Sequence, residues 1–322
     1  MTNFQVYRKT LSFSLLSFVV EIGAFLVLIG TSTAGFFIAN SSTEAALVGL
    51  LVGFVIGIIL VTLINIFINN RIKAAHIAMM TKGVTEGELP EKTFKAGFEE
   101  VRGRFAKITL FFFITNAIKG IFRQIGRSIN RIGTALGGDV GNSVTSVIDS
   151  AIQTLISYLC DCCLAWVLYR KDQNSALAAC EGAVIFFKHG KTLFRNIGRI
   201  FGMGFLFFVL VGGGFFGISY LILFSIPDVF QPLLKALQDF AGSDYPEILN
   251  NPTMVTIIAS AIIGVVMYSI LHSVLIRPFI LTGVMRNFMA AGKEHIPTES
   301  EFAELEKKSP RFAKLRNSAN NG

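Results

Sequence analysis

Two carboxylates lie inside apolar stretches of the sequence, where an ionised side chain is costly. Glu21 comes ten residues after Leu11, which begins one apolar run, and is therefore expected near the bilayer centre. Asp161 comes eight residues before Tyr169, which ends another run. An ionised acid in the hydrocarbon layer costs about 3 kcal/mol or more, so each must face protein or water. We predict that Glu21, Asp161 and His272 line a cavity that binds a proton, a cation or a cationic substrate. The alternative is that each acid makes a hydrogen-bonded contact between helices.

A second set of residues with chemical potential is a basic stripe at helical spacing. Isoleucines and a phenylalanine occupy the opposite stripe, so the segment 119–143 is expected to form a basic amphipathic helix followed by a linker. Its cations recur at every fourth position and are Lys119, Arg123, Arg127 and Arg131. Anionic lipid headgroups are the predicted partner, with an anionic substrate or neighbouring acids as alternatives.

A third pattern concerns helix packing. Gly49, Gly53 and Gly57 recur at every fourth position of one apolar run. Three glycines on one helix face allow another helix to approach closely. We predict that this face packs against a helix of the same chain or of a second copy.

The cysteine-rich segment gives a weak metal signature. Cys160, Cys162 and Cys163 flank Asp161, but neighbouring residues on a helix point in different directions and no paired Cys or His motif lies nearby. No sequence signature of a hydrolase, a metalloprotease or a phosphate-binding loop is present. The sequence therefore predicts no catalytic residues, no metal and no cofactor.

The elements that must position these residues are apolar helices. Of the 322 residues, 52% are hydrophobic and only 16% are charged, against about 25% charged in soluble domains. This composition argues against a soluble enzyme, a disordered chain and a disulfide-rich secreted domain. The net charge of +8 is expected to set membrane orientation rather than to bind nucleic acid.

The apolar runs predict an all-α polytopic bundle of about six spans, forming a single integral membrane domain over 1–322. Basic residues retained in the cytoplasm place both termini inside, in a plasma or inner membrane. The segments 69–105 and 170–198 are expected as cytoplasmic helical loops, and 277–322 as a basic cytoplasmic tail. The predicted spans are 11–38, 44–68, 106–122, 144–169, 199–225 and 253–276. The short run at 106–122 must cross or enter the membrane because 144–169 cannot alone join two cytoplasmic loops.

A faint internal repeat also relates two parts of the chain that lie 207 residues apart. Leu89-Pro90 matches Ile296-Pro297, and the five residues from Arg104 match the five from Arg311. Each copy follows an apolar span, a helical stretch and then the proline. The pattern predicts two similar helix–turn–helix elements.

A longer stretch shows a family resemblance. Cys162-Cys163-Leu-Ala-Trp is followed by an Ala-rich amphipathic helix and then by Leu193-Phe-Arg-Asn-Ile-Gly-Arg199 before an apolar span. This order resembles the core of the choline transporter-like family over about a third of the chain, and 71–90 is similar in layout to that family's cytoplasmic helix and turn. This chain is shorter and lacks the family's large extracellular loop. The resemblance implies facilitated transport of choline or a related amine, with Glu21 and Asp161 as cation partners.

These features together predict a membrane transporter or permease-like protein for a small cationic or amphiphilic solute. The alternative is a membrane scaffold or accessory subunit that packs against partner helices and binds anionic lipid. Self-association through the glycine face is compatible with both functions.

Overall fold

The structure is a computed structural model that describes residues 1–39, 42–104, 114–121, 124, 142–193, 197–241 and 246–320. Every regular element in these ranges is a helix, so the all-α prediction is confirmed. The chain forms two compact units. Unit 1 comprises Met1–Phe13, Lys73–Ile197 and Pro278–Gly322, and unit 2 comprises Ser14–Ile72 and Gly198–Arg277.

The described residues contain four helices that are long and apolar enough to cross a membrane. They are Leu11–Ile38, Glu44–Thr85, Gly202–Phe224 and Pro252–Glu294. At most 28% of the most apolar window in any of them is buried, as expected for helices surrounded by lipid. The predicted count of six spans is not confirmed. The run at 106–122 lies largely outside the described residues, and the run at 144–169 yields only a shorter apolar helix, Ile156–Tyr169.

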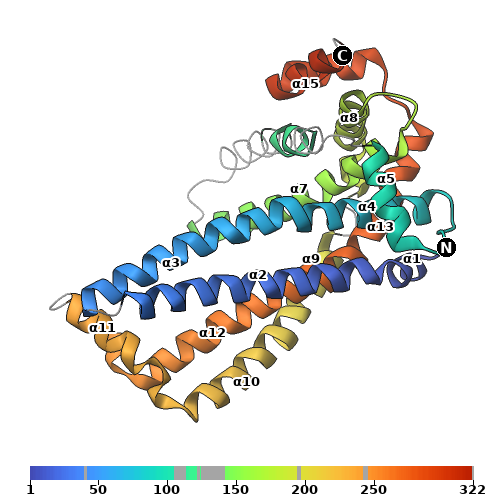
Figure 1. Ribbon diagram of the computed structural model, residues 1–322. Helices are drawn as coiled ribbons and strands as arrows, with labels where there is room; N and C mark the ends of the chain where they lie inside the picture. The colour runs from blue at the N-terminus through green and yellow to red at the C-terminus, as the bar shows by residue number, and fades with distance from the viewer. Residues whose placement is uncertain are drawn as a thin grey trace. The chain divides into compact units, whose positions relative to one another are not determined.

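Unit 2 contains a tight hairpin of α2 (Leu11–Ile38) and α3 (Thr43–Ile64), which lie side by side (Figure 1). The glycine face of α3 lies against α2. A Cβ atom on Gly49 would come within 2.2 Å of the Gly35 carbonyl oxygen, and one on Gly53 within 2.2 Å of the Thr31 carbonyl oxygen. A Cβ atom on Gly57 would lie 2.5 Å from the Thr31 hydroxyl oxygen and 3.2 Å from the Leu28 Cα atom. The backbones of α2 and α3 are closer here than any residue larger than glycine would allow.

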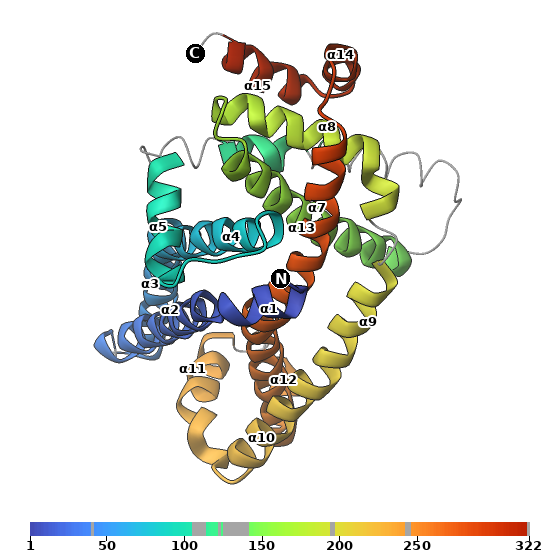
Figure 2. The ribbon, with the colours of Figure 1, turned by 90° about the vertical axis from the view of Figure 1, so that its right-hand side faces the viewer.

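A second hairpin of unit 2 pairs α10 (Gly213–Phe224) with α12 (Pro252–Leu271) (Figure 2). The chain enters α10 through α9 (Ile197–Phe207) and the π-helical segment η2 (Phe208–Gly212). Along the chain, α10 and α12 are connected by the 3-10 helix η3 (Pro227–Phe230), helix α11 (Gln231–Ala241) and the 3-10 helix η5 (Glu247–Asn250). Helix α11 contacts α3.

Both hairpins continue through a π-helical segment into a further helix. In the first, η1 (Asn65–Asn69) leads into α4 (Asn70–Thr85), and in the second, η6 (His272–Ile276) leads into α13 (Arg277–Glu294). The two π segments lie 207 residues apart at both ends, which is the offset of the sequence repeat. After Pro90 comes α5 (Thr93–Arg104), and after Pro297 comes α14 (Glu299–Lys308). The two predicted helix–turn–helix elements are therefore present.

Unit 1 is built around the second half of α7 (Asn142–Tyr169), where every residue from Tyr158 to Leu168 is buried. It also contains α1 (Asn3–Lys9), α8 (Ser175–Leu193), α15 (Pro310–Asn320), most of α4 and α13, and a helix at 114–121. Helices α14 and α15 contact α8 (Figure 2). The stretch predicted as the fourth span thus ends in the protein core of this unit.

Candidate functional site

Glu21 is the centre of a polar cluster in unit 2. Ser273 donates a hydrogen bond of 2.8 Å to Oε2 of Glu21, and the Asn69 amide donates one of 3.4 Å to Oε1. Asn69 also donates to Oδ1 of Asn65 at 3.2 Å. Asn65 and Asn69 belong to η1 and Ser273 belongs to η6, so both π-helical segments contribute to the cluster. Such segments often occur at functional sites.

Helix lengths place this cluster near one end of the apolar layer. The 22 residues of α3 and the 20 residues of α12 measure about 30–33 Å at 1.5 Å per residue, which matches a hydrocarbon thickness of about 30 Å. Asn69 and Ser273 follow these helices directly. A carboxylate bonded to both lies close to the end of the layer rather than at its centre, where we had expected Glu21, and its ionised form costs less there.

His272 is half-buried and precedes Ser273 in η6. Its ring centroid is 5.4 Å from that of Tyr268 and 6.5 Å from that of Phe207. In the repeat, His272 at the start of η6 corresponds to Asn65 at the start of η1. The described contacts of this histidine are therefore aromatic, on the helix that supplies Ser273.

Asp161 belongs to unit 1, whereas Glu21 belongs to unit 2. The Asp161 carboxylate is almost completely buried and lies 2.9 Å from Nζ of Lys73, whose side chain is 40% exposed. A buried carboxylate paired with a cation of its own chain is the arrangement expected of an interhelical contact. Lys73 was not among the predicted site residues. Its position just after the first hairpin is the sequence feature that could have indicated it as a partner of an acid.

The buried end of α7 is held by further polar contacts. The indole N–H of Trp166 donates to Glu181 at 2.8 Å, and a guanidinium nitrogen of Arg170 lies 3.1 Å from the same carboxylate. Arg170 also bonds Asp172, and this hydrogen bond raises the pKa of Arg170 and lowers the pKa of Asp172. Cys160, Cys162 and Cys163 are buried as free thiols in the same stretch.

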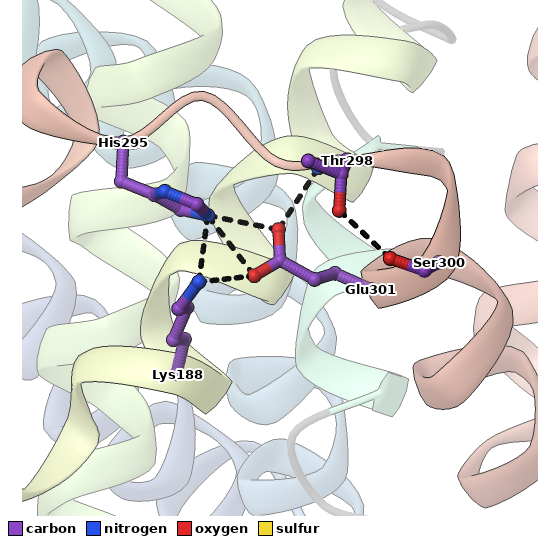
Figure 3. A network of polar contacts seen from close by, with 5 residues as sticks. All are labelled: Lys188, His295, Thr298, Ser300 and Glu301. Carbon is purple, nitrogen blue, oxygen red and sulfur yellow. Dashed lines mark hydrogen bonds and ion pairs between the residues drawn. The ribbon is translucent and has the colours of Figure 1, made fainter.

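A polar network that the sequence did not indicate joins α8 to α14 (Figure 3). Lys188 contacts Glu301 and lies 2.9 Å from Nε2 of His295, which in turn lies 2.9 Å from Glu301. The Thr298 backbone N–H donates to Glu301 at 2.9 Å. The hydrogen bond from Lys188 is the main cause that lowers the pKa of Glu301 to about 2, and those from Thr298 and His295 add to it.

Of the predicted lipid-binding cations, only Lys119 falls within the described residues. Its side chain is exposed on the helix at 114–121. Arg123, Arg127 and Arg131 lie outside the described residues.

Unit 2 also contains an apolar cavity of about 290 Å³ between η2–α10 and α12. Phe208, Gly212, Phe216 and Gly264 are among the residues that line it. Its lining carries almost no polar surface, so it does not extend the Glu21 cluster.

Comparison with known proteins gives no identification: no protein-family model, no curated protein and no solved structure matches the chain.

Proposed function

We propose that the protein is a membrane transporter for a small cationic or amphiphilic solute, and that Glu21 is its cation-binding carboxylate. The observation that carries the proposal is the pair of hydrogen bonds from Asn69 and Ser273, because they bring the two π-helical segments of the repeat to one acid. Internal repeats with a site at their interface are typical of transporters. A change in the protonation or occupancy of Glu21 would alter its contacts with both hairpins.

The π-helical segments suit this role. A π turn widens the helix by one residue, and it marks a point where a helix changes its hydrogen-bond register. Each segment joins a membrane-capable helix to a helix that continues into unit 1. The mechanism we propose is alternating exposure of Glu21 as the hairpins shift about η1 and η6, with His272 adjoining the site.

We further propose four spans with both termini in the cytoplasm. Gly120 contacts Arg311, and Gln124 accepts a hydrogen bond of 2.9 Å from Ser309. These contacts favour the same side of the membrane for the helix at 114–121 and the C-terminal tail. If the predicted spans 106–122 and 144–169 do not cross the membrane, two crossings are removed together. Every basic loop then stays on the side of the membrane that was predicted for it. The plasma or inner membrane is proposed from these basic loops.

A membrane scaffold or accessory subunit is the second candidate, and two observations favour it. Lys73 compensates Asp161, so this acid holds unit 1 together instead of receiving a cationic solute. The glycines of α3 are fitted closely to α2, which suits a fixed anchor. In this case the exposed helix faces of unit 2 would contact partner helices or further copies of the chain, and the basic surfaces would contact anionic lipid.

Uptake by reconstituted protein separates the two candidates. Choline and related amines come first in the panel of solutes, since the resemblance to the choline transporter-like family implies them. A transporter gives saturable uptake that depends on Glu21, whereas a scaffold gives none for any solute.

A further inference from the structure

The C-terminal segment carries more cations than its acids can pair. In the described residues after Glu294, all four acids take part in ion pairs inside unit 1. Glu299 and Glu306 pair with Arg316, Glu301 pairs with Lys188, and Glu304 pairs with Lys308.

Three cations of this segment are left over. Lys307, Arg311 and Lys314 are exposed and form no ion pair within the described part of the chain. Arg311 and Lys314 lie three residues apart on α15, so their side chains are neighbours on one helix face.

The absence of a side chain at Gly120 leaves room for the side chain of Arg311. A Cβ atom on Gly120 would lie 2.5 Å from Nη1 of Arg311 and 3.2 Å from its Cδ. The guanidinium therefore lies against the helix at 114–121, at the residue that follows the exposed Lys119 in the sequence. The hydrogen bond between Ser309 and Gln124 holds α15 against the same segment. Cations of two elements that are far apart in the sequence thus lie near the contact between α15 and the segment from 114 to 124.

Arg104 is the residue of the repeat that corresponds to Arg311, and its hydrogen-bond donors are satisfied within the protein. Arg104 donates from Nε to the Val167 carbonyl at 3.0 Å and from Nη2 to the Arg170 carbonyl at 2.8 Å, at the end of α7. Arg311 has no such acceptors among the described residues. Because its side chain is also exposed, its planar set of donors is open to a ligand.

We propose that Lys119, Arg311 and Lys314 form a binding site for the phosphate group of an anionic lipid headgroup. The fork of N–H donors on arginine matches two phosphate oxygens, and the lysines add positive charge. A lipid is the chosen source because the same chain carries four membrane-capable helices. The proposal adds α15 to the predicted basic helix, and it does not depend on transport.

The test uses the full-length protein in a neutral detergent, titrated with dioctanoyl phosphatidylglycerol and followed by thermophoresis. Each cation near an anionic surface contributes a factor of about five in affinity. Arg311→Gln should therefore weaken binding about fivefold, and the double variant with Lys119→Gln about 25-fold. Lys92→Gln removes an exposed lysine from another surface and should leave the affinity unchanged.

Gly120→Ala tests whether the guanidinium must be positioned. The added methyl group displaces the end of the Arg311 side chain and leaves the charge of the protein unchanged. A built site predicts a loss similar to that of Arg311→Gln, whereas a diffuse basic surface predicts none. Thermal unfolding of each variant checks that the fold is kept, and Lys119→Gln gives an independent variant on an exposed residue.

Three results would overturn the proposal. The first is binding of phosphatidylglycerol that Arg311→Gln and Lys119→Gln leave unchanged. The second is equal binding of dioctanoyl phosphatidylcholine. The third is binding of inorganic phosphate at the same concentrations with the same dependence on Arg311, which would assign the site to free phosphate. Solute uptake is a separate readout, so failure here leaves the transport proposal intact.

Discussion

Ser273 donates a hydrogen bond of 2.8 Å to Glu21, although 252 residues separate them in the sequence. The same hydroxyl also lies 2.9 Å from the Ile270 carbonyl. The contact ties the second hairpin of unit 2 to the acid of the first.

Ser273→Ala removes this donor and should lower stability by about 1–2 kcal/mol, because Glu21 loses a bond in a poorly solvated place. For a chain of this size that corresponds to a fall in Tm of roughly 2–5 °C, measured by thermal unfolding in detergent. The matched control is Ser269→Ala on α12. Among the described residues its exposed hydroxyl bonds only Val265 of its own helix, so the Tm of this variant should stay within about 1 °C of the wild type. Equal shifts in both variants would contradict the role of Ser273.

The fit between α2 and α3 gives a second prediction. Gly53→Ala puts a methyl group 2.2 Å from the Thr31 carbonyl oxygen, and rigid backbone cannot move away cheaply. We expect a loss of about 1–3 kcal/mol or more in unfolding free energy. Gly30→Ala on α2 has open space around it and should be neutral or slightly stabilising, because alanine favours helix. Thermal unfolding of the two variants measures the difference, and a Gly53→Ala protein as stable as Gly30→Ala would refute the close contact.

The four-span topology predicts which engineered cysteines a membrane-impermeant maleimide can reach. The four native cysteines are buried, so they give a low background. Lys119→Cys and Asp172→Cys should label from the same side of intact vesicles, and Gln238→Cys on α11 from the other side. Six spans would place residue 119 at the end of a crossing, on the side opposite residue 172. Labelling of Lys119→Cys together with Gln238→Cys would therefore support six spans.

The Glu301 network predicts a dependence on pH. The folded-state pKa of Glu301 is about 2, below the ordinary 4.5, so its ionised form stabilises the fold at every pH above about 4.5. This contribution is lost as the pH falls from about 4.5 to about 2. Glu301→Gln removes it, so the difference in Tm between wild type and variant should shrink across that interval. Glu88→Gln, at an exposed position, is the control. A difference that stays constant from pH 6 to pH 3 would contradict the network.

The sequence predicted the helical class, the two helix–turn–helix elements and the presence of an acid within a membrane-capable helix, because each depends on local composition or spacing. The depth of Glu21 was not predicted, since it depends on how the helices pair. The six-span count rested on the apolar run at 144–169, and hydropathy does not distinguish a helix buried in protein from one buried in lipid. The half of α7 from Tyr158 to Leu168 is of the former kind.

The residues that contact Asp161 and Glu21 could not be predicted from local composition or spacing. Lys73 and Ser273 approach Asp161 and Glu21 from segments 88 and 252 residues away, and no local rule predicts such contacts. Their positions at the ends of apolar helices, and the repeat that places η1 and η6 at equivalent points, were the signals that could have indicated them.

The most direct test of the proposed function is uptake of radiolabelled choline and related amines into proteoliposomes that contain wild-type, Glu21→Gln, Asp161→Asn or Glu44→Gln protein at matched amounts. We expect saturable uptake by the wild type, loss of at least about tenfold in Glu21→Gln and no loss in the exposed-site control Glu44→Gln. Asp161→Asn should reduce uptake only in proportion to its loss of folded protein, measured by size-exclusion chromatography. Saturable uptake that Glu21→Gln retains, or no uptake of any amine by well-folded wild-type protein, would contradict a transporter centred on Glu21.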